Sequence, residues 1–262
     1  MAAIGAGASP DPYGRIAYPG LIAWPERLQR EAPLLQRVLG AGPSRQVLDL
    51  GCGSGEHTRF LTALGFQAIG VDVSPSQVDA ARRADPAGRY LQVGLTTLGD
   101  GIRAGQGGAL CLGNTLPHLC EEAEVLSFFS GLAPLLLPSA PFLLQLLNYD
   151  RILDRGERTF PVVLRPGEAE GESTLFLRLM THHGGGRLTF TPAHLCYRPG
   201  TATPLELVAA HDVPLHGWRR AEVEALLGAC GFQVREVLGS MTGEAWSPTS
   251  TDLVIVAVPA AG

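Results

Sequence analysis

The sequence predicts an α/β fold with a mainly parallel sheet and a small antiparallel insertion, on three observations. Short apolar runs alternate with helix-compatible segments between about residue 46 and residue 148. A glycine-rich turn, Gly51 to Gly55, separates the first apolar run from the helical segment after it. Residues 151–210 then change to alternating segments with glycine-rich turns, a pattern that is typical of antiparallel strands.

The elements expected in the first half follow from the apolar runs and their breaks. Five strands are expected there, at residues 46–50, 67–72, 90–93, 109–112 and 142–148. Four helices are expected around them, at residues 25–39, 57–64, 75–84 and 121–132. Ser74 can cap the third of these helices, and Pro75 suits its first turn. The last strand is an almost unbroken apolar run, so we expect it to be buried on both faces.

The second half is expected to hold a hairpin and the closing elements. The hairpin joins 174–180 to 187–191 through a turn at His182–Gly186, whose histidines we interpret as exposed turn residues. Further elements are a strand at 205–210, a helix at 218–227, and strands at 232–238 and 252–258. We therefore divide the chain into an N-terminal tail and lid (1–24), a cofactor-binding core (25–150), an insertion (151–212) and a closing part of the core (213–262).

Composition and charge argue against several classes of function. The net charge is −5 and no basic cluster is present, which argues against a nucleic-acid partner. All 20 basic residues are arginine, so the sequence offers no lysine for Schiff-base or P-loop chemistry. We find no signal-peptide pattern and no apolar run long enough for a membrane span. The five cysteines form no C-x-x-C pair, so we expect a cytoplasmic protein without a metal site.

The glycine-rich turn predicts a site for a ligand that carries a ribose. Gly51 and Gly53 let main-chain amides approach a ligand, and the helix after them offers its N-terminal dipole. Asp72 closes the second strand about twenty residues later, where a carboxylate can accept hydrogen bonds from ribose hydroxyls. Glu56 replaces the third glycine of the dinucleotide fingerprint, and its charge suits a pyrophosphate poorly. A nicotinamide-dependent oxidoreductase is therefore a disfavoured alternative.

The stretch Val47 to Gly55 resembles the D-x-G-x-G-x-G signature loop of class I S-adenosylmethionine-dependent methyltransferases. Two further stretches, Gly113 to Leu119 and Asn148 to Leu153, are similar to the ends of the fourth and fifth strands in glycine N-methyltransferase and the bacterial glycine/sarcosine methyltransferases. The resemblance covers most of the chain from about residue 18. It implies a seven-stranded Rossmann-like methyltransferase sheet, an antiparallel β insertion as a substrate lid, and S-adenosyl-L-methionine as cofactor.

The resemblance also implies roles for single residues. Arg27 matches, by its spacing before Asp49, the arginine that pairs with the methionine carboxylate of the cofactor. The residues expected around the cofactor are Arg27, Asp49, Gly51, Gly53, Asp72, Val73, Leu95, Leu112, Thr115 and His118. The residues expected to orient a small-molecule acceptor are Asn114, His118, Tyr149 and Tyr18, with His118 as the nearest titratable base.

Three departures from the family leave alternatives open. Leu147 replaces the arginine that grips the glycine carboxylate, so we do not expect glycine as the substrate. Gly94 and Gly107 stand near positions where the family has acids or an amide. The sequence therefore predicts either an enzyme that methylates a small-molecule nitrogen or oxygen, or a non-catalytic protein that binds the cofactor in an eroded site. A homo-oligomer is compatible with either reading, and Asp49 could instead bind the amides of the glycine loop.

Overall fold

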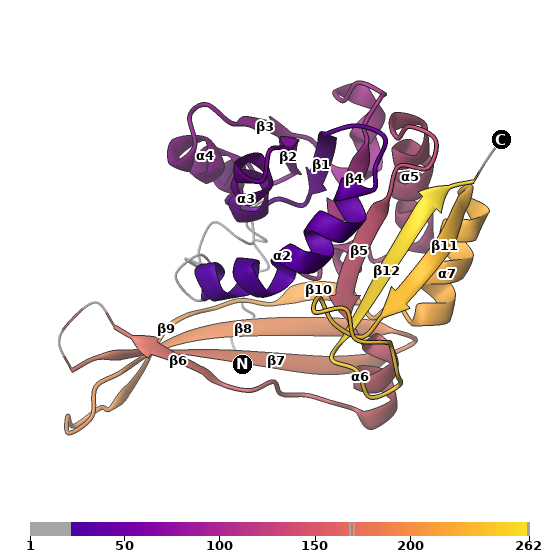
Figure 1. Ribbon diagram of the computed structural model, residues 1–262. Helices are drawn as coiled ribbons and strands as arrows, with labels where there is room; N and C mark the ends of the chain where they lie inside the picture. Colours follow the sequence, from indigo (N-terminus) through magenta and orange to yellow (C-terminus); the bar gives the residue numbers. More distant parts are fainter. Residues whose placement is uncertain (1–21, 168, 170, 261–262) are drawn as a thin grey trace.

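The computed structural model describes residues 22–167, 169 and 171–260, which form two β-sheets (Figure 1). The larger sheet has the strand order β11-β12-β5-β4-β1-β2-β3. The strands β1 to β5 run parallel, and β12 runs antiparallel to both β5 and β11. Their bounds are β1 (Gln46–Leu50), β2 (Gln67–Asp72), β3 (Arg89–Gln92), β4 (Gly108–Cys111), β5 (Phe142–Leu147), β11 (Phe232–Leu238) and β12 (Asp252–Pro259). The predicted seven-stranded Rossmann-like sheet is confirmed.

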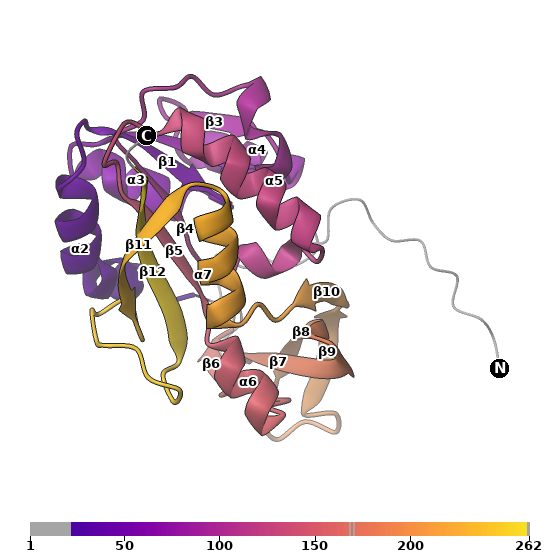
Figure 2. The same ribbon diagram turned by 90° about the vertical axis from the view of Figure 1, so that its right-hand side faces the viewer.

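Helices cover both faces of this sheet, because successive side chains of a strand point in opposite directions. Val47 of β1 packs with residues of α2 and α3, whereas Leu48 packs with residues of α5 and α7. Figure 2 shows α5 and α7 on one side of the sheet, with α2 and α3 on the other. The helices are α2 (Trp24–Gly40), α3 (Glu56–Ala63), α4 (Pro75–Ala84), α5 (Glu122–Leu132), α6 (Tyr149–Arg155) and α7 (Arg220–Ala229). Short 3-10 segments are η1 (Leu95–Asp100), η2 (Leu116–His118) and η3 (Ala133–Leu135).

Local capping explains where several of these helices begin. Ser74 caps α4 as predicted, since its Oγ accepts a hydrogen bond from the amide of Gln77 at 3.2 Å. Asn148 was predicted as the last residue of a strand, but its side chain accepts from the amide of Arg151 and caps α6. Helix α6 was not predicted from the sequence. Across the described parts of the chain, no helix has the length and apolar character needed to cross a membrane.

The second sheet comes from the insertion and has the order β10-β8-β7-β6, with β9 paired to β8. Its strands are β6 (Val163–Pro166), β7 (Ser173–Gly184), β8 (Arg187–Tyr197), β9 (Leu205–Ala210) and β10 (Val213–His216). The predicted hairpin is β7–β8, and the predicted strand at 205–210 is β9. Neither β6 nor β10 was predicted, and β10 carries this sheet past residue 212, where the sequence had placed the end of the insertion.

The second sheet packs against the core through one of its faces. Met180, Leu188 and Leu215 belong to the same buried cluster as Leu48. The indole nitrogen of Trp218 donates to the carbonyl of Leu119 at 2.9 Å and so ties the segment after β10 to the loop after β4. Figure 1 shows this sheet as a separate layer, with α6 at one end and with β6 and β9 at the other.

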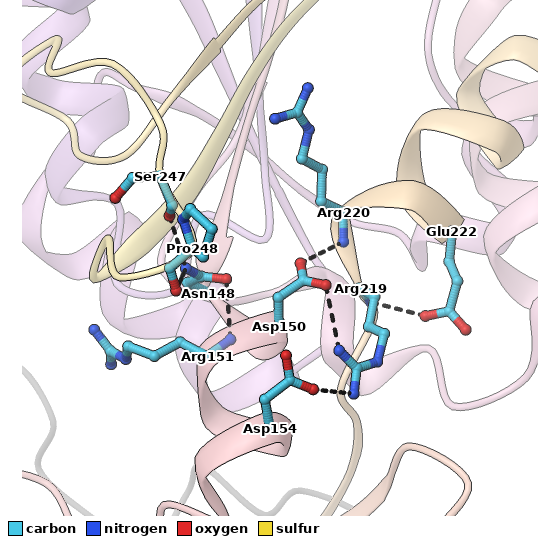
Figure 3. Close-up of polar contacts among 9 residues, drawn as sticks. All are labelled: Asn148, Asp150, Arg151, Asp154, Arg219, Arg220, Glu222, Ser247 and Pro248. Atoms are coloured by element: carbon cyan, nitrogen blue, oxygen red, sulfur yellow. Dashed lines mark hydrogen bonds and ion pairs between the residues drawn. The ribbon is translucent and has the colours of Figure 1, made fainter.

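A polar cluster holds the boundary between the core and the insertion (Figure 3). The side-chain amide of Asn148 donates to the carbonyls of Ser247 and Pro248, in the loop before β12. Asp150 accepts from the amide of Arg220, the first residue of α7, at 2.9 Å, and from the guanidinium of Arg219 at 3.4 Å. The start of α6 is therefore fastened to two elements that lie about 70 to 100 residues later in the chain.

Candidate functional site

A cavity of about 520 Å³ lies beyond the carboxyl ends of β1, β2 and β4. Its walls come from the start of α2, the loop after β1, the end of β2, the segment after β3 and the loop after β4. This edge of an open α/β sheet is where ligands bind. All ten residues that the sequence predicted around a cofactor line this cavity: Arg27, Asp49, Gly51, Gly53, Asp72, Val73, Leu95, Leu112, Thr115 and His118.

The loop after β1 needs glycine for two physical reasons. Gly51 and Gly53 have φ angles of 77° and 53°, in the left-handed region that other residues rarely adopt. A Cβ on Gly51 would also lie 2.5 Å from the side chain of Thr115, which comes from the loop after β4. The two loops can therefore meet only where one of them lacks a side chain. The amides of Gly51 and Cys52 are both bound to the carbonyl of Val71.

Asp72 is fixed at the mouth of this loop by two backbone amides. One carboxylate oxygen accepts from the amide of Gly53 at 2.8 Å, and the other accepts from the amide of Ser74 at 2.9 Å. Each carboxylate oxygen has two lone pairs, so it can accept more than one hydrogen bond. Asp49 behaves differently, because it is buried and accepts from the hydroxyl of Thr58 at 2.6 Å. Burial raises the pKa of Asp49.

A buried charge cluster forms the wall that α2 contributes. The carboxylate of Glu31 accepts from Arg27 Nε at 2.8 Å through one oxygen, and its other oxygen lies 2.7 Å from Nε2 of His57. Burial by itself raises the pKa of Glu31, but the hydrogen bond to His57 and the charge of Arg27 outweigh it, so the net pKa is lowered. The guanidinium of Arg27 also lies 5.0 Å from the ring centre of Trp24.

Arg27 is therefore not an exposed helix charge, since only 20% of its side chain is exposed. Its ion pair with Glu31 uses Nε, which leaves the two terminal nitrogens for a ligand. No role was predicted for Glu31 or His57 from the sequence. Glu31 stands one helical turn after Arg27, a spacing that could have indicated the ion pair. His57 lies 26 residues from Glu31, and no local pattern predicts that contact.

His118 and Glu124 mark the part of the cavity wall between the loop after β4 and α5. Burial lowers the pKa of His118 to about 4, so its imidazole is neutral at pH 7. A neutral imidazole can accept a hydrogen bond from an acceptor N–H or O–H group. Glu124 accepts from the amide of Glu121 at 3.0 Å through one oxygen. Leu95 and Leu119 supply apolar surface beside them.

Asn114 and Tyr149, which the sequence predicted to orient an acceptor, are placed differently. Tyr149 is fully buried, and burial raises the pKa of its hydroxyl. Asn114 donates to that hydroxyl at 3.0 Å and accepts from the amide of Leu147 at 3.0 Å. Neither residue belongs to the described wall of the cavity. Their positions suit residues that hold the loop after β4, rather than residues that touch an acceptor.

Other predictions about the site have mixed outcomes. Tyr18 lies outside the described residues, and its role stays a prediction. The cavity wall, as far as the chain is described, includes no residue of the second sheet, so the role of the insertion as a substrate lid also stays a prediction. Gly94 lines the cavity, whereas Gly107 does not and packs against Ser44. An acid missing at Gly107 therefore removes nothing from the described wall.

The cavity fits a cofactor that carries a sulfonium, a ribose and an amino-acid end. Among the described residues, its wall holds four carboxylates and one arginine, a balance that suits a cationic ligand with one carboxylate; the carboxylates are Asp49, Glu56, Asp72 and Glu124. The indole nitrogen of Trp24 is buried in the same wall and has no hydrogen-bond partner among the described residues, so it is a donor that a ligand could satisfy. Glu56 lines the cavity as well, where it would oppose a pyrophosphate.

Comparison of the sequence with known proteins gives one family match and several partial relatives. Residues 47–138 match the family described as "Methyltransferase domain". The glycine/sarcosine N-methyltransferase of Parasynechococcus marenigrum is 30% identical over 140 residues, which cover 52% of this chain and 50% of that protein. The trans-aconitate 2-methyltransferase of Methylobacterium nodulans is 41% identical over 75 residues, or 28% of this chain and 29% of that protein. The chain spans about half the length, or less, of the curated relatives it matches.

Solved structures resemble this chain over nearly its whole length. The sugar N-methyltransferase KedS8 from Streptoalloteichus has a TM-score of 0.74 and 20% identity, covering 100% of this chain and 99% of that one. CalS10, an amino pentose methyltransferase from Micromonospora echinaspora whose structure holds S-adenosylmethionine, has a TM-score of 0.71 and 21% identity, covering 93% of this chain and 94% of that one. At these identities the likeness establishes the fold alone.

Proposed function

We propose that this chain, which carries a class I S-adenosylmethionine-dependent methyltransferase domain, transfers a methyl group to a nitrogen or oxygen of a small-molecule acceptor other than glycine. The observation that carries the proposal is the gathering of Arg27, Asp72 and His118 around one cavity at the carboxyl edge of the sheet. An eroded, non-catalytic site would be expected to lose such residues, so the presence of all ten predicted cofactor residues in the wall of one cavity supports the catalytic reading over the non-catalytic one.

S-adenosylmethionine, when bound, supplies a methyl group that its sulfonium already activates. The residues of this chain then have to bind the cofactor, orient the acceptor and exclude water. The terminal nitrogens of Arg27 would pair with the carboxylate of the methionine moiety, in the bidentate geometry that guanidinium groups favour. Asp72 would accept hydrogen bonds from the ribose hydroxyls, and Val73 and Leu95 would contact the adenine with apolar surface.

The acceptor must present a lone pair to the methyl group, so an amine has to be neutral when it reacts. His118 is neutral at pH 7 and can accept a hydrogen bond from the nucleophile, which orients it. Glu124 places a carboxylate in the same wall and would favour a basic acceptor. The names of the similar structures, a sugar N-methyltransferase and an amino pentose methyltransferase, support an amine or amino sugar as the first class to test.

The absence of glycine activity is part of the proposal. In the family that the sequence resembles, an arginine before the N-Y-D stretch binds the glycine carboxylate, and Leu147 occupies that position here. An apolar side chain cannot pair with a carboxylate. We therefore expect acceptors that carry no carboxylate beside the reacting amine.

The test combines binding and turnover in the purified chain. Calorimetry should detect S-adenosylmethionine and S-adenosylhomocysteine, and incubation with labelled cofactor should give a methylated product from a panel of amines, amino sugars and hydroxyl compounds. Glycine and sarcosine should remain unmethylated. Binding without turnover over the whole panel would support the non-catalytic reading, and turnover of glycine would contradict the role assigned to Leu147.

A further inference from the structure

The segment after β3 and the first turn of α5 meet at one end of the cavity. The hydroxyl of Ser127, in α5, donates to the carbonyl of Thr96, in η1, at 3.1 Å. Glu124 precedes Ser127 by three residues, a spacing that places two side chains on the same face of a helix. Leu95, Thr96 and Glu124 all line the cavity. Glu124 is therefore the carboxylate that α5 brings to the cavity wall beside η1.

The base of a bound nucleoside would lie at this end of the cavity. Arg27 belongs to the wall from α2, and Asp72, which would hold the ribose, closes β2. The strand order β4-β1-β2-β3 places the segment after β3 on the side of Asp72 that is away from β4. Apolar side chains gather on that side, where Val73, which is 68% exposed, lines the cavity with Val93 and Leu95. A flat aromatic base would cover this apolar surface.

One oxygen of the Glu124 carboxylate is engaged within the protein and the other is not. Oε2 accepts from the amide of Glu121, the residue that caps α5, at 3.0 Å. This bond is half of a capping box, and it fixes the side chain at the start of the helix. Oε1 has no hydrogen-bond partner within the described part of the chain. Oε1 is therefore available to a donor on a ligand.

Backbone acceptors at the same end of the cavity already have donors. The carbonyl of Gly94 accepts from the amide of Thr97 at 3.1 Å and from its hydroxyl at 3.2 Å. The carbonyl of Thr96 accepts the bond from α5 described above, and the carbonyl of Leu119 accepts from the indole of Trp218. A donor on the base would have to share these oxygens. A charged side-chain oxygen without a partner is the stronger acceptor.

We propose that Glu124 recognises the base of the cofactor, by accepting a hydrogen bond at Oε1 from the exocyclic amino group of adenine. The inference rests on the proposed function, since it takes S-adenosylmethionine as the ligand. Adenine presents an amino donor at this position, whereas guanine presents a carbonyl oxygen that a carboxylate repels. Glu124 therefore determines which base is bound. A carboxylate keeps its charge when it accepts a hydrogen bond, so Glu124 still contributes to the negative potential that favours a basic acceptor.

The test compares two ligands on the same protein. Calorimetry measures the dissociation constants of S-adenosylhomocysteine and of its analogue in which hydrogen replaces the 6-amino group. The wild type should bind the amino form about 10- to 100-fold more tightly, the range for a hydrogen bond to a charged group. Glu124→Ala should reduce this ratio to less than about threefold. Glu124→Gln should give an intermediate ratio, because its amide oxygen can accept but carries no charge.

The matched control removes a carboxylate from the same turn of the same helix. Glu122 is exposed and lies outside the described cavity wall, so Glu122→Ala changes the charge at the start of α5 without touching the ligand. This variant should keep the wild-type ratio. Thr96→Val removes the hydroxyl of a neighbouring residue in the wall and should keep the ratio as well. Because each ratio is taken within one variant, a smaller folded fraction does not change it.

The outcomes separate this inference from the proposed function. A wild type that binds the two ligands equally, or a Glu124→Ala protein that keeps the wild-type ratio, would overturn the role of Glu124. Loss of the ratio in Thr96→Val and not in Glu124→Ala would also overturn it. The measurement uses no methyl transfer, so a chain that binds the cofactor and methylates nothing contradicts the proposed function and still yields the ratio. A wild type that binds neither ligand would overturn both.

Discussion

Arg27 shows how the function of one side chain depends on partners that are buried behind it. Glu31 fixes Nε at 2.8 Å, and Glu31 is itself held by His57 at 2.7 Å. The ring of Trp24 covers the guanidinium on another side. A long flexible side chain fixed in this way loses less entropy when it binds a carboxylate, so the cluster is a device for positioning Arg27.

The first prediction concerns Arg27 directly. Arg27→Ala should weaken the binding of S-adenosylmethionine by about 10- to 100-fold, the range expected for loss of charge-assisted hydrogen bonds. Calorimetry measures the effect. Arg30→Ala is the matched control, because Arg30 is an exposed arginine on the same helix and outside the cavity wall. Equal affinities for the two variants would contradict the role of Arg27.

The second prediction concerns His118 and pH. The folded protein protonates His118 near pH 4, whereas the unfolded chain protonates it near 6.5. Between these values the unfolded state binds more protons, so the contribution of His118 to the free energy of unfolding is lost as the pH falls from 6.5 to 4. His118→Gln should remove that loss, which amounts to roughly 3 kcal/mol at pH 4. Denaturant unfolding at several pH values measures this loss. If the free energy of unfolding changes with pH in the same way for the wild type and for His118→Gln, the prediction is contradicted.

At the scale of elements, the junction of β5 and α6 makes more contacts with distant segments than its sequence indicated. Asn148 caps α6 and also holds the loop before β12, while Asp150 holds the start of α7. Tyr149 lies between them and reaches the loop after β4 through Asn114. Three consecutive side chains thus join four separate segments of the chain, and each one leaves a polar group without a partner if it is removed.

The third prediction separates two acids of α6. Asp150→Ala should lower the free energy of unfolding by about 1–2 kcal/mol, because it removes the carboxylate that accepts from the first amide of α7. Asp154→Ala should cost less than about 0.5 kcal/mol, because Asp154 pairs with Arg219 at an exposed position. Urea unfolding compares the two variants. An equal loss of unfolding free energy would show that the contact between Asp150 and the amide of Arg220 stabilises the fold no more than the exposed ion pair does.

The fourth prediction tests whether Tyr149 positions a loop or reacts. Tyr149→Phe leaves the amide of Asn114 without its partner, so we expect a loss of about 1–2 kcal/mol in unfolding free energy. Turnover with any acceptor found should stay within a few-fold of the wild type, with an unchanged pH profile. A loss of about 100-fold or more in kcat would restore Tyr149 as a catalytic residue. Tyr197→Phe, in the second sheet, is the control and should change neither quantity.

At the scale of the whole molecule, the cavity depends on several segments that converge on one edge of the sheet, including the segment after β3. The loops after β1 and β4 and the end of β2 come from neighbouring parallel strands, and α2 closes the wall from one side. Because strands β1, β2 and β4 are adjacent and parallel, their carboxyl ends necessarily meet. A ligand that bridges these segments binds the native state and not the unfolded chain.

The fifth prediction follows from that bridging. S-adenosylmethionine at about 100 times its dissociation constant should raise the free energy of unfolding by about 2.7 kcal/mol, a shift of several degrees in Tm. Thermal unfolding with and without the ligand measures it. NAD should give no shift, because Glu56 lies in the wall where a pyrophosphate would have to pass. A shift with NAD and none with S-adenosylmethionine would overturn the assignment of the cofactor.

Much of the core could be predicted because its signals are local. Strands β1 and β2 and helix α4 have the predicted bounds, since apolar runs and the Ser74–Pro75 cap lie within a few residues of each other. The elements that were missed, β6, α6 and β10, are short and lack a strong period of their own. They exist because of partners elsewhere: β10 pairs with β8, and α6 is held by the contacts of Asn148 and Asp150.

The sequence by itself determined the turn at Gly51 and Gly53 and the acid at Asp72, because glycine spacing and strand order can be read from residues that are close together in the chain. The wider set of residues around the cavity followed from the resemblance to a known family. Only the tertiary structure decided that His57 supports Glu31 and that Tyr149 is buried. Burial and pairing between distant residues arise when the layers pack together, and no single segment of the chain contains that information.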